Sequence, residues 1–325
     1  MDTANLMGLL TDWLSDPAPI VITLVGALLA GFLYWRGARY ARRTGIGRPV
    51  EALQAVAFGS GLVVLFVAIG SPFDALADRS LAAHMLQHAL LILIVAPLLL
   101  LGEPFWRIWR ALPVGWRRES LRWLLQRRRA RRVWGALEAL ARRPVATLLL
   151  FLGVFLLWHL PALYQLALNN EWIHAFEHVC FLGVALLFWA QVIPIFPLRS
   201  QMTYIQRVGY LFVAGIVLHL FSILIALAQQ PIYRYYGSGP AAIADQQAAG
   251  AAMDVTGMLV FTIALLVCLG LWLRDEDRAG AAAPGEAAHA LVASASAGGA
   301  LLLLEADTLA ADALAAAGEP PTREE

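Results

Sequence analysis

Seven long apolar runs constrain this chain more than any other feature. The sequence is 60% hydrophobic and only 14% charged, and its apolar residues are concentrated in stretches long enough to cross about 30 Å of hydrocarbon as helices. The predicted fold class is therefore an all-α integral membrane protein, built as a bundle of seven transmembrane helices. The predicted spans are 18–36, 52–70, 81–102, 145–165, 172–194, 208–229 and 252–273.

The first apolar run is expected to remain in the mature protein. It follows a polar stretch that contains Asp12, Asp16, Pro17 and Pro19. Neither a basic n-region nor a small-residue cleavage signal precedes the run, so it differs from a cleaved signal peptide.

Arginine indicates the orientation, because the chain has 24 basic residues and none of them is lysine. Many arginines follow the first and third spans, at 36–48 and 107–143, whereas the opposite side of the predicted membrane has only Arg79 and Arg234. The positive-inside rule then predicts an external N-terminus and a cytoplasmic C-terminus.

Two regions outside the spans have distinct compositions. Residues 103–144 form an arginine-rich cytoplasmic loop within a membrane domain of residues 1–277, and apolar residues recur at helical spacing over 113–143. This pattern predicts helices on the membrane surface, with anionic lipid as the partner and a docked protein as the alternative. The tail, 278–325, is rich in Ala and Gly, and we expect it to be a disordered cytoplasmic segment.

Histidine is the residue type that points to function. Six of the seven histidines lie in or beside apolar runs, and four of them form two pairs in the strings HMLQH and HAFEH. A spacing of four residues places both members of a pair on one face of a helix, one turn apart. An ionisable residue in a membrane span indicates a functional site. The pairs are His84/His88 and His174/His178.

The predicted topology brings these histidines to one side of the membrane. The third and fifth spans both run inward, so the two pairs enter at nearly the same depth. His159 lies at the outer end of the fourth span, and His219 lies near the middle of the sixth. A polar cluster of this kind, supplied by several helices, is suited to binding a metal, a haem or a proton.

We expect five histidines to be metal ligands, because neutral imidazole is the commonest metal ligand in proteins. These are His84, His88, His159, His174 and His178. Carboxylates and soft donors gather at the same level, where a carboxylate beside a histidine can fix its tautomer. The expected accessory residues are Asp74, Glu177, His219, Asp245 and Met85; for His219 and Met85, packing and hydrogen bonding between helices are the competing interpretation.

Other site types receive no support from the sequence. Cys180 and Cys268 lie in different predicted helices without CxxC spacing, so no disulfide or thiolate site is expected. We find no nucleophile with its base, no glycine-rich phosphate loop and no nucleic-acid surface, and we therefore predict a protein that is not an enzyme.

Three blocks of sequence resemble one known family. They are SPFDALADRSLAAHMLQHALLILIVAPLLLLGEP at 71–104, WHLPALYQLALNNEWIHAFEHVCFLGVALLFWAQVI at 158–193 and ADQQAAGAAMDVTGMLVF at 244–261. Their motifs, order and spacing are similar to those of the CtaG family of bacterial cytochrome c oxidase assembly factors. The segment IALAQQPIYRYY after the sixth span departs from the family pattern, and His219 lies outside its motifs.

The resemblance implies a multi-pass protein of the bacterial plasma (inner) membrane that helps to mature a haem-copper oxidase and handles copper for it. Its partners would be cytochrome c oxidase subunits or other assembly factors, together with membrane lipid. The family motifs fall on the five candidate ligands and on Asp245, and Asp74 matches the acidic position of the first block.

Two other functions fit the histidine pattern. A membrane-embedded zinc hydrolase would hold Zn²⁺ through an HxxxH pair, with Glu177 or Asp74 as the base. A b-type haem protein would use histidines on facing helices as axial iron ligands. Copper, zinc and haem therefore all remain open from the residues alone.

Overall fold

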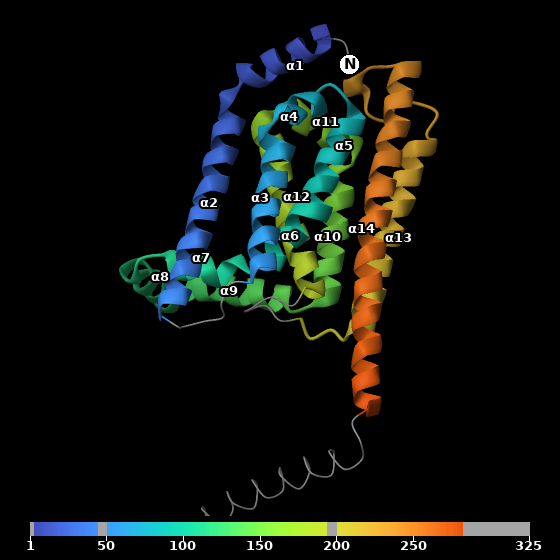
Figure 1. Ribbon diagram of the computed structural model, residues 1–325. Coiled ribbons are helices and arrows are strands. Elements are labelled where there is room, and N and C mark those ends of the chain that lie inside the picture. The colour runs from blue at the N-terminus through green and yellow to red at the C-terminus, as the bar shows by residue number, and fades with distance from the viewer. Residues whose placement is uncertain (1–2, 45–50, 194–199, 282–325) are drawn as a thin grey trace, which may run out of the picture. The chain divides into compact units, whose positions relative to one another are not determined.

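The computed structural model describes residues 3–44, 51–193 and 200–281, and all regular structure within these ranges is helical (Figure 1). The chain divides into two compact units, Met1–Leu269 and Gly270–Glu325. The first unit holds six of the seven histidines. In the second unit the described residues are the last turns of a helix, with an ion pair between Arg278 and Asp275.

Six of the described helical segments are long and apolar enough to cross a membrane. They are α2 (Pro17–Thr44), α3 (Ala52–Gly70), the run Leu81–Leu101, α12 (Glu171–Val192), α13 (Tyr204–Leu227) and α14 (Pro240–Ala281). The number becomes seven if α9 (Arg128–Ala141) and α10 (Pro144–Trp158), which meet at a bend of 93°, count as one broken span. The helical membrane protein is thus confirmed, while seven spans and the orientation stay predictions.

The apolar run 145–165 does not form one helix. α10 ends at Trp158, and a separate short helix, α11 (Pro161–Leu168), follows it. Pro161 has no N–H and restricts the residue before it to extended backbone, and Leu160 has the extended values φ −64° and ψ 130°. The prediction of a helix to residue 165 is wrong for this reason, but the break leaves His159 at the end of α10, where the sequence placed it.

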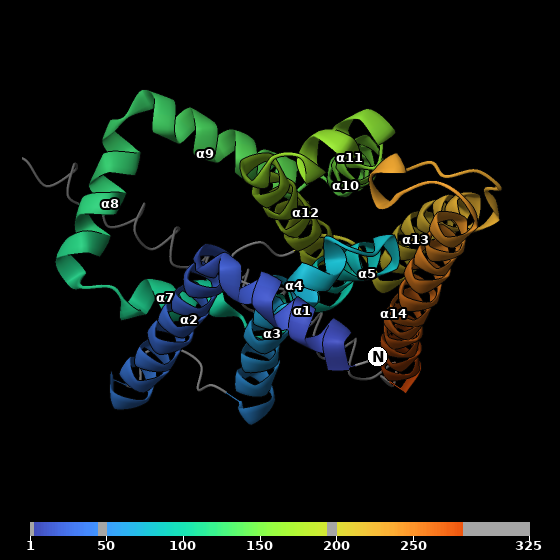
Figure 2. The same cartoon turned by 90° about the horizontal axis from the view of Figure 1, so that it is seen from above.

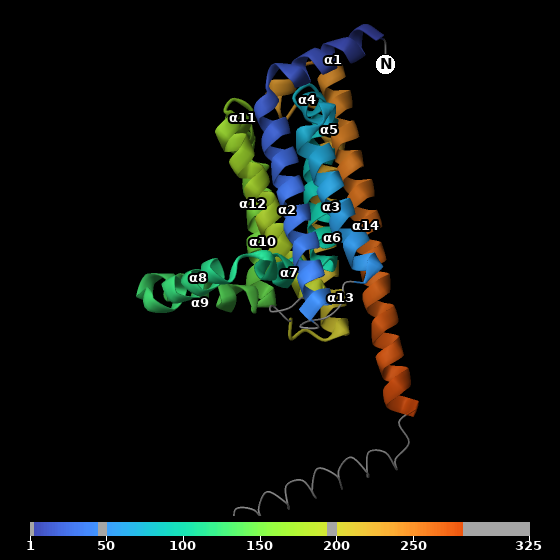
Figure 3. The same ribbon diagram turned by 60° about the vertical axis from the view of Figure 1, so that its left-hand side comes forward.

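Shorter helices connect and flank the spans. The arginine-rich region is helical as predicted, and its helices lie across the direction of α2 and α12 (Figures 1 and 3). These elements are α1 (Thr3–Ser15), α4 (Pro72–Ala77), α7 (Pro104–Ala111), α8 (Val114–Gln126), α9 and the 3-10 turn η2 (Arg234–Tyr236).

The span 81–101 contains a π-helical turn. It consists of α5 (Leu81–Ala89), the π segment η1 (Leu90–Val95) and α6 (Ala96–Leu101). In π register the carbonyl of Ile92 would accept from residue 97, but Pro97 has no N–H to donate. The indole Nε1 of Trp189 on α12 donates to this carbonyl at 2.9 Å instead. An interhelical bond therefore satisfies a backbone group that would be costly to leave unpaired in a membrane.

The same span is the centre of the packing. It contacts α3 on one side and α12 on the other, and α10 packs against both α12 and α13 (Figure 2). α13 and α14 approach closely where Gly250 lies, because a Cβ built there would be 2.6 Å from the Ala226 nitrogen and 2.7 Å from the Ser222 oxygen. Only glycine fits at this crossing.

Substitution of Gly250 should therefore separate α13 from α14. We expect Gly250→Ala to lower the melting temperature of the purified protein, since the clash is with backbone. Gly257→Ala is the matched control in the same helix, because a Cβ there meets nothing within 4 Å, and alanine favours a helix over glycine by about 1 kcal/mol. A melting temperature for Gly250→Ala that equals or exceeds that of Gly257→Ala would contradict the close approach.

Candidate metal centre

Both histidine pairs lie in the first turns of their helices. α5 begins after Ser80, whose Oγ accepts from the Ala83 N–H at 3.3 Å. α12 begins after Asn170, whose Oδ1 accepts from the N–H groups of Trp172 and Ile173 at 3.0 and 3.2 Å. These caps satisfy backbone donors that a helix leaves unpaired at its N-terminus. They fix where each helix starts, and hence which way the paired histidines face.

The two pairs converge on one point between α5 and α12. One nitrogen from each of His84, His88, His174 and His178 can be chosen so that all lie within 4.8 Å of one another. The ring centroids of His84 and His174 are 5.0 Å apart, and those of His88 and His178 are 5.3 Å apart. Only His174 is partly exposed, while the other three are buried. These residues, here called the four-histidine group, can hold a metal ion.

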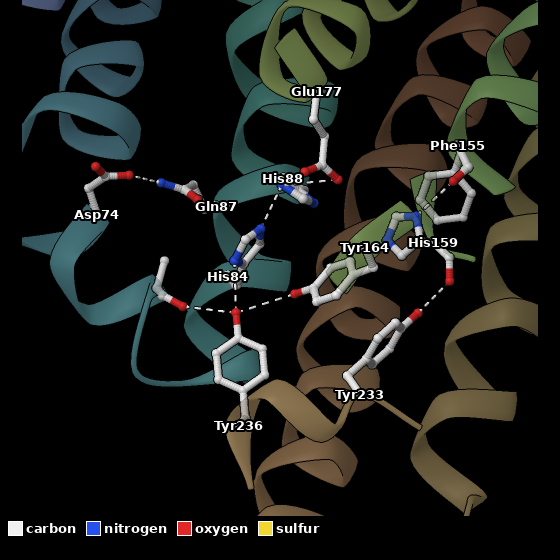
Figure 4. A network of polar contacts seen from close by, with 11 residues as sticks. Asp74, His84, Gln87, His88, Phe155, His159, Tyr164, Glu177, Tyr233 and Tyr236 are labelled. Atoms are coloured by element: carbon white, nitrogen blue, oxygen red, sulfur yellow. Dashed lines mark hydrogen bonds and ion pairs between the residues drawn. The ribbon is translucent and has the colours of Figure 1, made fainter. Parts of the chain in front are cut away.

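A tyrosine fixes the proton on His84. The hydroxyl of Tyr236 donates to the carbonyl of Ala77 at 3.1 Å and lies 2.9 Å from Nδ1 of His84 (Figure 4). Burial raises the pKa of Tyr236, so the hydroxyl keeps its single proton. A carbonyl can only accept, so that proton points to Ala77 and His84 Nδ1 must donate to the tyrosine oxygen. The lone pair of His84 is therefore on Nε2, which faces the group.

His88 continues this chain of hydrogen bonds. Its Nε2 lies 3.0 Å from Nε2 of His84. Since the His84 nitrogen carries a lone pair, His88 must donate from Nε2, and its own lone pair is on Nδ1. That Nδ1 atom is buried and has no hydrogen-bond partner.

His159 lies outside the four-histidine group but next to it. Its ring centroid is 6.1 Å from that of His88, and its Nδ1 lies 2.7 Å from the carbonyl of Phe155. The carbonyl can only accept, so Nδ1 carries the proton and the lone pair is on Nε2. This Nε2 is also buried and unpartnered. Tyr233 holds the backbone here, since its hydroxyl donates to the His159 carbonyl at 2.8 Å.

Glu177 brings a carboxylate to the same place. The side chain is buried, and neither of its oxygens has a hydrogen-bond partner. Oε1 lies 4.0 Å from Nε2 of His88 (Figure 4). An ionised carboxylate without a partner is costly in an apolar interior. A cation bound among the histidines would compensate its charge.

Asp74 lies one step further out and contacts the span through a glutamine. Gln87 on α5 donates from Nε2 to Asp74 Oδ1 at 2.5 Å and to the Ala68 carbonyl at 2.7 Å (Figure 4). Gln87 directly precedes His88 in the sequence, so this contact joins Asp74 to the helix that carries the first histidine pair. Burial raises the pKa of Asp74 to about 7, and the Gln87 hydrogen bond opposes this shift only partly.

Asp245 caps the N-terminus of the helix that carries His84 and His88. Its carboxylate accepts from the Leu81 N–H at 2.6 Å, the Ser80 hydroxyl at 2.7 Å and the Ala82 N–H at 3.4 Å. An acceptor at the N-terminus of a helix stabilises that terminus. Asp245 therefore ties α14 to the start of α5, the helix that carries His84 and His88.

The remaining accessory residues lie elsewhere. His219 on α13 contacts Asp254 on α14, with 2.5 Å between Nδ1 and Oδ1. Met85 is fully buried in the hydrophobic core and is not in the four-histidine group. Cys180 and Cys268 are both free.

The ligand atoms of the four-histidine group indicate which metal ions it can bind. Four neutral imidazoles match the ligand preferences of copper and zinc. The unpartnered buried nitrogens of His174 and His178 are available for such bonds. A haem fits less well, because axial ligands must lie on opposite faces of a macrocycle, whereas these rings pack directly against one another with centroids 4.4 to 6.5 Å apart.

Sequence reasoning missed the tyrosines and the glutamine around the group. Tyr164 lies within 3.4 Å of Tyr236, hydroxyl to hydroxyl, and Tyr236 is in the segment that departs from the family pattern. No spacing rule links residue 236 to residue 84. Gln87 had a signal, since it is a polar residue between His84 and His88 on a span whose other residues are mostly apolar.

Comparison with known proteins places the chain in a family. Residues 32–275 match the model of the cytochrome c oxidase caa3 assembly factors, Caa3_CtaG. The chain belongs to this family. The resemblance seen in the motifs is thereby confirmed.

One relative is an uncharacterized protein of Mycobacterium leprae. It is 27% identical over 288 residues, which cover 84% of this chain and 41% of the relative. The chain therefore spans about two fifths of the length of that curated relative. No solved structure matches the chain.

The raised pKa of Asp74 makes stability depend on pH. The unfolded carboxyl group ionises near pH 4, but the folded one ionises at about 7. The folded state thus loses stability as the pH rises through this window. We expect the melting temperature of the wild type to fall between about pH 4 and about pH 7 and to level off above this range, and Asp74→Asn to flatten the fall. The exposed Asp275→Asn is the control, and equal pH profiles for all three proteins would contradict the burial of an ionisable Asp74.

Proposed function

We propose that this CtaG protein binds copper in the four-histidine group and supplies it during assembly of a cytochrome c oxidase in the bacterial plasma membrane. The observation that carries the proposal is the convergence of four imidazole nitrogens within 4.8 Å, at an apolar position between two membrane helices. Histidines are expensive in a membrane interior and are retained there for function. Membership of an oxidase assembly family supplies the context in which copper is the cargo.

Exchange of the ion requires an open edge. His174 is the least buried member of the group, while His84 and His88 are at most 1% exposed. An incoming or outgoing ligand would therefore reach the ion beside His174. The predicted orientation puts this edge on the outer side, from which periplasmic copper would arrive.

The donor set supports a carrier more than a zinc hydrolase. A catalytic zinc ion keeps one coordination position open for water, whereas four imidazoles complete a tetrahedral site. Glu177 is the nearest carboxylate, and its distance of 4.0 Å from a ring nitrogen suits charge compensation. A site that binds zinc without hydrolysing a substrate is the remaining alternative. Competition between copper and zinc for the protein distinguishes the two.

Membrane lipid is the proposed partner of α8 and α9. These helices expose large apolar side chains next to arginines, the pattern of helices that lie at an anionic membrane surface. The exposed apolar residues include Trp116, Trp123, Leu125, Val133 and Trp134.

The ligand assignment predicts loss of copper when the four histidines are removed together. We expect the purified wild type to retain about one Cu(I) ion per chain under reducing conditions, and the variant His84→Ala/His88→Ala/His174→Ala/His178→Ala to retain almost none. His219→Ala, which removes a histidine outside the group, is the control and should retain copper. Equal copper in the wild type and the quadruple variant would sink the proposal, as would preferential retention of zinc over copper in competition.

The tyrosine that orients His84 should also affect affinity. Tyr236→Phe removes the acceptor for His84 Nδ1–H, and loss of such a partner lowers metal affinity by about 10- to 100-fold. Tyr235→Phe changes the neighbouring, more exposed tyrosine and should leave the affinity as in the wild type. The affinities would be measured by competition with a chromophoric Cu(I) chelator. Identical values for the two variants would show that Tyr236 does not orient His84.

A further inference from the structure

The hydrogen-bond directions around the four-histidine group leave two lone pairs beside it. His84 accepts from Nε2 of His88, so the lone pair of His88 is on Nδ1, and His159 likewise has its lone pair on Nε2. Both atoms are buried without a partner. In Figure 4 the free nitrogen of His159 is on the side of its ring that faces His88. Two buried lone pairs beside each other are acceptors that a cation between them would satisfy.

We propose that His88 and His159 form a second copper position, and that His88 passes the ion between this position and the four-histidine group. The inference rests on the proposed function of the group and adds a route within it. The ring centroids of His88 and His159 are 6.1 Å apart. One ion fits between facing nitrogens at this separation, because each metal–imidazole bond is about 2.0 Å long.

The chemistry of imidazole makes the two positions alternatives. A neutral ring has one proton and one lone pair, so His88 can serve the four-histidine group through Nε2 or the second position through Nδ1, but not both. When the ion moves into the group, the proton of His88 moves from Nε2 to Nδ1. The number of protons and electrons is unchanged. His88 is thus a switch between two sites.

The surroundings suit a transient, water-free position. Aromatic rings enclose His159, with centroids at 4.3 Å for Phe155, 4.9 Å for Phe221 and 5.8 Å for Phe181. Two imidazoles bind Cu(I) less tightly than four, so the ion can leave again. Glu177, whose oxygens have no hydrogen-bond partner, lies 4.0 Å from His88 Nε2 and balances the ionic charge in either position.

Variants that keep one position and remove the other test the relay. His174→Asn/His178→Asn removes half of the four-histidine group and leaves His84, His88, His159 and Glu177. It should retain about one Cu(I) ion with weakened affinity. X-ray absorption of this variant should show two imidazole ligands. Adding His159→Asn to the double variant should weaken binding at least about tenfold further. His219→Asn, added to the double variant instead, is the matched control and should change nothing.

The outcomes separate this inference from the proposed function. A wild type that binds no Cu(I) overturns the proposed function and the relay with it. A wild type that binds Cu(I), with equal binding in the double and the triple variant, overturns the relay alone. Size-exclusion profiles and melting curves confirm folding, and His174→Gln/His178→Gln replaces the double variant if the asparagine version does not fold.

Discussion

The hydrogen bond from Tyr236 to the Ala77 carbonyl determines the tautomers of His84 and His88, two of the four histidines of the group. Because the hydroxyl proton is used there, His84 must donate from Nδ1, His88 must then donate to His84, and the free lone pair of His88 points to His159. Each direction follows from the one before it. A single residue, 152 positions from His84, thus decides which nitrogens of His84 and His88 are available to a metal ion.

The helices around the histidines satisfy their buried backbone polar groups with side-chain hydrogen bonds. Asp245 caps the start of α5, Asn170 caps the start of α12, and Trp189 satisfies the carbonyl that Pro97 leaves unpaired in the π turn. The Asp245 and Trp189 contacts tie the helices that carry the ligands to their neighbours, and all three contacts remove the cost of unpaired backbone groups. Among the described residues, six of the eleven buried side-chain N and O atoms without a hydrogen-bond partner belong to His88, His159, His174, His178 and Glu177. That contrast supports a bound cation.

Sequence patterns predicted the parts of this structure that depend on local periodicity. The apolar runs predicted helices, and the spacing of four residues predicted that His84 and His88 share a face. The end of α10 before His159 was predicted only in part. The apolar run continues to residue 165, and Pro161 is the one residue that signals a break. The roles of Tyr236, Tyr233 and Asp245 could not be predicted, since each contacts a segment distant in sequence and no helical or loop spacing connects them. His219, predicted only as an accessory residue with an interhelical hydrogen bond as the competing interpretation, contacts Asp254 on the neighbouring helix.

X-ray absorption at the copper edge of the Cu(I)-loaded wild type is the most direct test of the ligand set. We expect scattering from three or four imidazole rings, with copper–nitrogen distances of about 2.0 Å and no sulfur ligand. A spectrum that requires a sulfur ligand, or one with no imidazole scattering, would contradict copper binding by the four-histidine group.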